Sequence, residues 1–158
     1  MTARHAVLFI CTGNICRSPT AEGVFRALVA ARGVADRFTI ESAGTHDYHV
    51  GSPPDARAIA AAKRRGVDLS RICARQVTKD DFTRFDLLLV MDEHNYERLA
   101  TDCPPTHRRK IRRFMEFAPQ SGRLAVPDPY YGGTNAFEEV LDLVEQAAEG
   151  LLDDLLNR

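Results

Sequence analysis

The clearest candidates for chemistry in this sequence are a cysteine and an arginine separated by five residues, Cys11 and Arg17. A loop of this length can curl so that its backbone N–H groups converge on one point, while the arginine holds two oxygens of a phosphoryl group. Gly13 permits unusual backbone angles, and Asn14 tolerates a left-handed conformation better than most residues. The spacing therefore predicts a phosphate cradle with a thiolate nucleophile, Cys11, at its base.

The predicted phosphate-binding loop lies between an apolar run and a helix, where free N–H groups and the helix dipole favour an anion. Its residues are Thr12, Gly13, Asn14, Ile15, Cys16, Arg17 and Ser18. Ser18 is expected to donate a hydrogen bond to the Cys11 sulfur and to help it leave later. A lone cysteine at a strand end is usually a small core residue, but the glycine, asparagine and arginine beside Cys11 favour the nucleophile.

Phosphoryl transfer to a thiolate also needs a proton donor for the departing oxygen. Asp128 stands between two prolines that restrict its backbone, and Tyr130 and Tyr131 follow it. An aspartate in this setting is otherwise a common turn residue. Paired with the loop at Cys11, Asp128 is predicted to be the general acid, and the two tyrosines are predicted to wall a pocket for an aromatic substrate.

Strand-like and helix-like segments alternate along the chain and must position these groups. The predicted strands are residues 6–10, 38–42, 86–91 and 110–114. One predicted helix begins at residue 21, and three others span 55–65, 93–100 and 137–155. Apolar residues recur there every three or four positions. This alternation predicts an α/β fold with a parallel sheet, helices on both faces and an active cleft at the carboxyl ends of the strands.

Composition narrows the function classes. At 158 residues the chain is most simply one domain, residues 1–158. The 21 Lys and Arg nearly balance the 22 Asp and Glu, which argues against nucleic-acid and membrane partners. The basic run at residues 107–113 is interpreted as a solvated loop and strand edge. Residues 1–5 lead directly into the first strand without a targeting-type segment, so a cytoplasmic location is expected.

The four cysteines show no paired CxxC spacing and are accompanied by no cluster of histidines. This pattern argues against a disulfide framework and against a zinc site. Cys73 and Cys103 are interpreted as structural or incidental. No metal and no cofactor is predicted.

Several segments, in their order along the chain, resemble the low-molecular-weight protein tyrosine phosphatases of the bacterial type. They are VLFICTGNICRSP at 7–19, SAGT at 42–45, GSPPD at 51–55, ARQVT at 74–78, VMD at 90–92 and DPY at 128–130. The resemblance implies a three-layer αβα fold, with a four-stranded parallel sheet of flavodoxin-like order and the phosphate-binding loop after strand 1. It also implies that Cys11 is the nucleophile, Arg17 the phosphate ligand and Asp128 the general acid.

The resemblance further implies hydrolysis of phosphotyrosine and other aryl phosphomonoesters through a cysteinyl-phosphate intermediate. Ile15, Tyr48, Tyr130 and Tyr131 are expected to line the substrate pocket. The expected substrates are phosphotyrosine proteins or small aryl phosphates, with a tyrosine kinase system as a candidate partner.

One departure from the family pattern concerns the support of the loop. Many bacterial members carry a histidine before the Ala-Arg-Gln segment, where it supports the loop asparagine, but residues 70–73 here read SRIC. Support for Asn14 is therefore expected from Ser18, Ser42 or another group.

Two alternative functions remain for a chain with this loop. A thiol-dependent arsenate reductase of the same fold would read Asn-Ser-Cys-Arg-Ser-Gln in the loop and carry two further cysteines close together downstream. This chain has Ile15 and Pro19 at the diagnostic positions, and Cys73 and Cys103 are far apart in sequence. A catalytically silent phosphate-binding module is disfavoured because Cys11, Arg17 and Asp128 are all present.

Cys16 is the one loop residue whose side chain phosphate binding does not explain, because the cradle would use its backbone N–H. A reactive thiolate at Cys11 is prone to oxidation to sulfenic acid, which a nearby thiol can capture as a disulfide. Cys16 is therefore predicted to be a redox partner of Cys11. The alternative is a small residue that merely fits.

Overall fold

The computed structural model describes residues 4–158, so part of the N-terminal segment interpreted above, residues 1–3, lies outside the described residues. Its centre is one parallel sheet in the order β2-β1-β3-β4. The strands are β1 (His5–Cys11), β2 (Phe38–Gly44), β3 (Leu87–Val90) and β4 (Ile111–Arg113). The sheet type and the four predicted strands are confirmed, with bounds that differ by a few residues.

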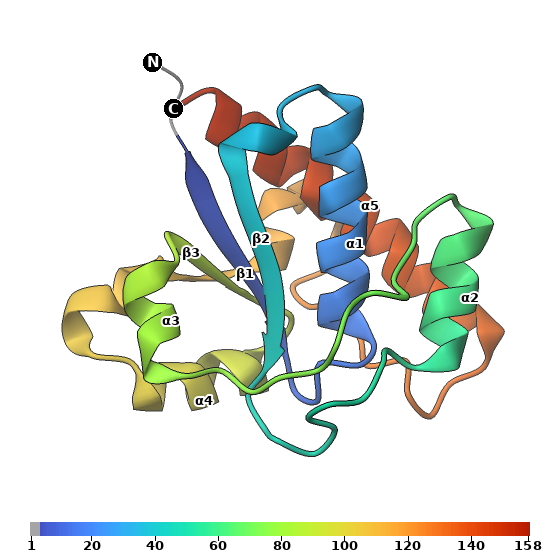
Figure 1. The fold of residues 1–158 in the computed structure, drawn as a ribbon, viewed down its shortest axis with the longest axis horizontal. Coiled ribbons are helices and arrows are strands. Elements are labelled where there is room, and N and C mark those ends of the chain that lie inside the picture. The colour runs from blue at the N-terminus through green and yellow to red at the C-terminus, as the bar shows by residue number, and fades with distance from the viewer. Residues whose placement is uncertain (1–3) are drawn as a thin grey trace.

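Helices cover both faces of this sheet (Figure 1). The α-helices are α1 (Arg17–Ala31), α2 (Ala56–Arg64), α3 (Lys79–Arg84), α4 (Glu93–Asp102) and α5 (Thr134–Leu156). Short 3-10 turns occupy Ala35–Arg37, Pro105–Lys110, Phe114–Phe117 and Pro119–Ser121. Helices α1, α2 and α5 pack on one face, and α3 and α4 pack on the other. The predicted three-layer αβα architecture is thereby confirmed.

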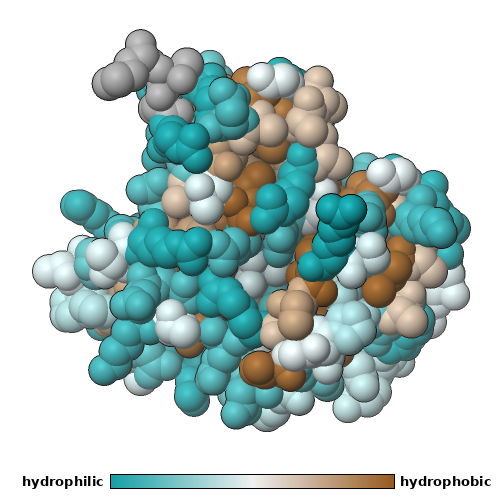
Figure 2. Space-filling model, viewed as in Figure 1, coloured by the Kyte–Doolittle hydropathy of each residue, from teal (hydrophilic) through white to brown (hydrophobic). Residues whose placement is uncertain are grey.

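Two hydrophobic cores result, because alternate residues of a strand point to opposite faces. In β1, Val7 and Phe9 join the core under α1 and α5, whereas Leu8 and Ile10 join the core under α3 and α4. All four are fully buried, which explains why the strand reads as a continuous apolar run. Figure 2 shows apolar patches over α1 and α2, and a mostly hydrophilic surface over α3 and α4.

Two helix predictions need correction. Helix α1 begins at Arg17 rather than at residue 21, and Pro19 falls in its first turn, where no intrahelical N–H bond is lost. Helix α3 was not predicted. It is six residues long and is stabilised by a capping box between Thr78 and Asp81 rather than by an apolar stripe.

The strand order places the candidate loop at the point where the connections diverge. The chain leaves β1 toward β2 on one side, and β3 lies on the other side of β1. In open α/β sheets the crevice at such a point, beyond the carboxyl ends of the strands, is the usual ligand site. Cys11 is the last residue of β1, so it stands at the base of this crevice.

Among residues 4–158, no helix is both long enough and apolar enough to cross a membrane.

Candidate active site

The Cys11 sulfur is held at the end of β1 by a neighbouring hydroxyl. Cys11 is only 3 % exposed, and its Sγ lies 2.9 Å from the Ser18 Oγ. The Asn14 Nδ2 donates to the same Ser18 Oγ at 2.8 Å. The single serine hydrogen can point at the sulfur or at the Ala43 carbonyl, which lies farther away at 3.5 Å. A bond to the sulfur would stabilise a thiolate.

The Asn14 side chain supports the loop on the side that faces away from the crevice. Its φ of 58° is in the left-handed region, and its side chain is buried. Besides Ser18, its Nδ2 donates to the Ser42 Oγ at 3.0 Å, and its Oδ1 accepts from the Arg75 backbone N–H at 3.0 Å. Ser42 in turn donates to the buried Glu22 carboxylate at 2.6 Å. The side chain therefore ties the loop to β2 and to the segment before α3.

The backbone N–H groups of the loop remain available for a ligand. Within residues 4–158, none of the N–H groups from Thr12 to Cys16 donates to a protein acceptor. The loop carbonyls are held instead, since Thr45 N–H donates to the Cys11 carbonyl at 2.9 Å and His46 N–H to the Thr12 carbonyl at 3.1 Å. A Cβ on Gly44 would lie 2.7 Å from the Thr12 carbonyl oxygen, so this approach requires glycine.

Arg17 is fixed on one edge and free on the other. Its Nη1 donates to the Asp92 Oδ2 at 2.6 Å and to the Val126 carbonyl at 3.1 Å, and the residue is 3 % exposed. Burial works to lower the pKa of Arg17, but Cys11 and Asp92 outweigh it and raise that pKa above its ordinary value. Both Nη1 protons are used, so Nε and Nη2 are left to hold two phosphoryl oxygens.

One cavity of about 380 Å³ collects these groups. Its lining residues are Cys11, Thr12, Gly13, Ile15, Cys16, Arg17, Tyr48, His49, Asp128, Tyr130 and Tyr131. The Asp128 carboxylate faces Arg17 across it, with Oδ2 3.9 Å from Nη2. Its Oδ1 accepts the Tyr130 N–H at 3.1 Å, which fixes the turn that presents it. The site thus holds a sulfur, a guanidinium and a carboxyl group around one space.

The aromatic walls are exposed and come from two loops. Tyr48 stacks on His46 with ring centroids 4.8 Å apart, and Tyr130 and Tyr131 meet edge to face at 5.0 Å. The Arg57 guanidinium lies 5.5 Å from the Tyr130 ring and donates to the Tyr130 carbonyl at 2.9 Å. Rings at the mouth of an anion cradle suit a flat aryl group attached to a phosphate.

Comparison with known proteins assigns the chain. Residues 6–158 match the profile of the family described as low molecular weight phosphotyrosine protein phosphatase. The chain belongs to this family. The low molecular weight phosphotyrosine protein phosphatase of Homo sapiens is 40% identical over 153 residues, covering 96% of both chains.

Solved structures agree with this assignment. A protein tyrosine phosphatase of Entamoeba histolytica, with Hepes in its active site, superposes with a TM-score of 0.94 at 38% identity, covering 97% of both chains. Wzb of Vibrio vulnificus, in complex with benzylphosphonate, superposes with a TM-score of 0.82 at 33% identity, covering 96% of this chain and 99% of the other. The predicted family, fold and enzyme class are confirmed, and the arsenate reductase and silent-module alternatives are not supported.

The phosphatase brings most of the predicted site residues into the cavity. Asn14 and Ser18 are the two that lie behind it, buried against β2. The support of Asn14 comes from Ser18 and Ser42, as expected, with the Arg75 backbone as the further group.

Two site residues of the phosphatase, Asp92 and His49, were missed as functional residues. Asp92 anchors Arg17 and also caps α4, accepting from the Asn95 N–H at 2.8 Å. It directly follows the buried run of β3, which was a usable signal. His49 covers the loop so closely that a Cβ on Gly13 would lie 2.9 Å from its ring, and no sequence pattern indicated this contact.

Residues 4–158 contain no group of three or more His, Cys, Asp or Glu side chains arranged to hold an ion.

The Asn14 network makes a first prediction. Asn14→Gly and Asn14→Ala both remove the side-chain bonds to Ser18, Ser42 and Arg75, so both should lower kcat/KM by about 10², the effect of a small misplacement. Only alanine has to strain at positive φ, so it should lower the free energy of unfolding by about 1 kcal/mol more than glycine. Urea unfolding and steady-state kinetics measure the two effects. Full activity in Asn14→Gly would show that the loop does not need this side chain.

Proposed function

We propose that Cys11, Arg17 and Asp128 hydrolyse phosphotyrosine in two steps through a cysteinyl-phosphate. In the first step the Cys11 thiolate attacks phosphorus, the bond to the aryl oxygen breaks, and Asp128 gives its proton to that oxygen. In the second step water attacks phosphorus, the S–P bond breaks, and the Asp128 carboxylate takes a proton from the water. Ser18 stabilises the sulfur as it leaves.

The observation that carries this proposal is the convergence of three groups on one cavity. The sulfur is at its base, Arg17 offers the free edge of its guanidinium with Nε and Nη2, and the Asp128 carboxyl lies on the opposite loop. Charge that develops on the equatorial phosphoryl oxygens is met by Arg17 and by the loop N–H groups. The aryl group would then lie between Tyr48 and Tyr130, with Ile15 and Tyr131 completing the walls.

One comparison of activities tests the reaction class. The protein should turn over p-nitrophenyl phosphate and phosphotyrosine, and it should show no thioredoxin-dependent turnover of arsenate. Arsenate turnover without phosphatase activity would overturn the proposal. If the protein showed neither activity, the result would point to a phosphate-binding module.

The physiological substrate is proposed to be a phosphotyrosine protein supplied by a tyrosine kinase system. Benzylphosphonate, present in the Vibrio vulnificus complex, carries a ring and a phosphonate on the same carbon atom. It therefore resembles phosphotyrosine, in which a single oxygen joins the ring to the phosphate. A Cys11→Ser trap incubated with lysate should retain phosphotyrosine proteins that inorganic phosphate releases. Retention that phosphate does not affect would contradict binding through this cavity.

A cytoplasmic location is also proposed, because the mechanism needs a reducing environment. The nucleophile must stay reduced, and all four cysteines are free in the structure. Cell fractionation tests this location directly.

Cys16 is proposed to protect Cys11 from overoxidation, and this gives a second prediction. Burial, followed by nearby Asp55, raises the pKa of Cys16 to about 12, so at neutral pH it stays a thiol and Cys11 meets the oxidant first. The Cys11 sulfenic acid then condenses with the Cys16 thiol to a disulfide and water. Peroxide should inactivate wild type reversibly, whereas Cys16→Ser should keep most activity but recover poorly with thiol. Equal recovery would leave Cys16 as a packing residue.

A further inference from the structure

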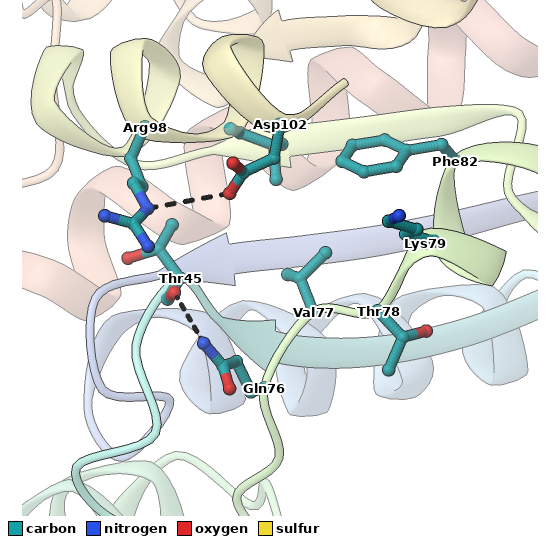
Figure 3. Close-up of a pocket in the computed structure, with 9 residues that line it drawn as sticks. Thr45, Gln76, Val77, Thr78, Lys79, Phe82, Arg98 and Asp102 are labelled. Carbon is teal, nitrogen blue, oxygen red and sulfur yellow. Dashed lines mark hydrogen bonds and ion pairs between the residues drawn. The ribbon is translucent and has the colours of Figure 1, made fainter. Parts of the chain in front are cut away.

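A second cavity lies beside the active site, between α4 and the segment that leads into α3. It measures about 230 Å³. Its lining residues are Thr45, Gln76, Val77, Thr78, Lys79, Phe82, Arg98, Leu99 and Asp102. Figure 3 shows Phe82 and Val77 directed into the space between α4 and residues 76–79, with Arg98 and Asp102 along its helical side. The proposed phosphatase mechanism uses none of these residues.

The floor of this cavity is apolar. Phe82 and Leu99 are each 2 % exposed and belong to the core under α3 and α4, and Val77 packs against the same core. The surface around this side of the molecule is mostly hydrophilic (Figure 2), so the recess is a local apolar feature. Its volume is below the range of about 300–1,000 Å³ that holds drug-sized ligands. It therefore suits a molecule with a single ring.

The rim of the cavity carries two cations, Lys79 and Arg98, and one carboxylate, Asp102. No hydrogen bond or ion pair joins the Lys79 ammonium to any group within residues 4–158. Among the described residues Arg98 pairs with Asp102 alone, at 3.6 Å, and both side chains are more than half exposed. Such a surface pair is weak, so both cations can turn to an anion. An apolar floor under two available cations fits the ring and the carboxylate of one small molecule.

Thr45 connects this cavity to the active-site wall. Its Oγ1 lies 2.8 Å from the His46 Nδ1, and the His46 ring stacks on Tyr48 at 16°. Its carbonyl accepts from the Gln76 Nε2 at 3.2 Å, the bond drawn in Figure 3. The same loop thus forms a wall of both cavities, with Thr45 on one side and Tyr48 on the other.

We propose that this cavity binds a small aromatic carboxylate and that its occupancy weakens binding of aryl substrate through Thr45, His46 and Tyr48. The carboxylate lies between Lys79 and Arg98, and the ring lies on Phe82 and Leu99. When the carboxylate of the bound ligand accepts the Thr45 hydroxyl, His46 loses its hydrogen bond to Thr45. The His46 ring that stacks on Tyr48 is then held less firmly. Coupling of this kind is reciprocal, so aryl substrate also weakens the ligand.

Binding is tested with 3-phenylpropionate as the probe and inorganic phosphate filling the active site. Amide NMR signals of Thr45, Gln76 and Val77 should shift saturably, with a Kd of about 1 mM for a one-ring ligand. Lys79→Glu should weaken the affinity at least about tenfold, whereas Lys79→Arg should retain it. The matched control is Lys63→Glu on α2, at the opposite side of the molecule in Figure 1, which should change nothing.

The coupling is tested by kinetics of the same proteins. Without added phosphate the probe should raise KM for p-nitrophenyl phosphate about fivefold and leave kcat unchanged, since Tyr48 contacts the ring rather than the reacting atoms. Thr45→Val should raise KM by itself and be insensitive to the probe. If the probe instead competed with substrate in the active site, its effect on KM would persist in Thr45→Val and Lys79→Glu. That result would overturn the proposal. Absence of saturable shifts in the wild type would also overturn it.

Discussion

Replacing Cys11 by serine should abolish turnover and leave phosphate binding intact. A serine hydroxyl in place of the thiol is not ionised at working pH, so no nucleophile meets the phosphorus. Arg17 keeps its bonds to Asp92 and to the Val126 carbonyl, and the loop N–H groups stay free. We expect kcat to fall by about 10⁴ or more, the scale seen when a nucleophile is removed. Calorimetric titration with inorganic phosphate should give a Kd close to that of the wild type.

Cys73→Ser is the matched control for this substitution. Cys73 is exposed and belongs to neither cavity, so its removal should leave kcat and phosphate affinity unchanged. If Cys11→Ser retained turnover within about tenfold of the wild type, a covalent step on sulfur would be ruled out.

The parts of the site that follow from local sequence were predicted best. The apolar runs of β1 and β3 are buried on both faces, which gives them an unmistakable pattern. The cradle depends on a single continuous loop, so the types and spacing of Cys11, Gly13 and Arg17 were sufficient to indicate it. The role of Asp128 was predicted from the proton donor that such a loop needs, together with the rigid prolines on either side of it.

The contacts that hold the loop from outside were much harder to predict. The Arg75 bond to Asn14 uses a backbone N–H across 61 positions of sequence, and a backbone donor carries no residue-type signal. Glu22 lies on α1 as a buried carboxylate that accepts from Ser42 and from Arg26, although glutamate is normally a surface residue. Both contacts depend on the packing of α1 against β2 and on the path before α3, which side-chain periodicity does not encode.

Asn14 is held without the histidine that the family resemblance led us to look for. Residues 70–73 contain no histidine, yet the amide of Asn14 has three protein partners. Arg75 is itself fixed by a two-pronged contact with the buried Asp81, with Nη1 at 2.9 Å and Nη2 at 3.1 Å. That ion pair orients the segment whose N–H reaches Asn14. Rigidity of the loop therefore depends on α3 as well as on the loop itself.

Replacing Asp128 by asparagine should slow hydrolysis of phosphotyrosine by about 10² to 10⁴, the usual contribution of a general acid. The amide oxygen of asparagine can still accept the Tyr130 N–H, so the loop should keep its conformation. An amide has no proton to transfer to the leaving oxygen. The loss in kcat/KM should therefore be large for phenyl phosphate and small for p-nitrophenyl phosphate, whose leaving group needs little protonation.

The dependence on leaving group distinguishes proton transfer from a purely electrostatic effect. Asp128 lies 3.9 Å from the Arg17 Nη2, so its removal also changes the charge that phosphate meets. That change is the same for every aryl ester, whereas the need for a proton grows with the basicity of the leaving oxygen. Asp47→Asn, which neutralises an exposed carboxylate on the loop of Tyr48, is the matched control and should affect all esters equally and weakly. Equal losses for p-nitrophenyl and phenyl phosphate in Asp128→Asn would assign the proton to another donor, and the Asp128 carboxyl would then act on substrate binding alone.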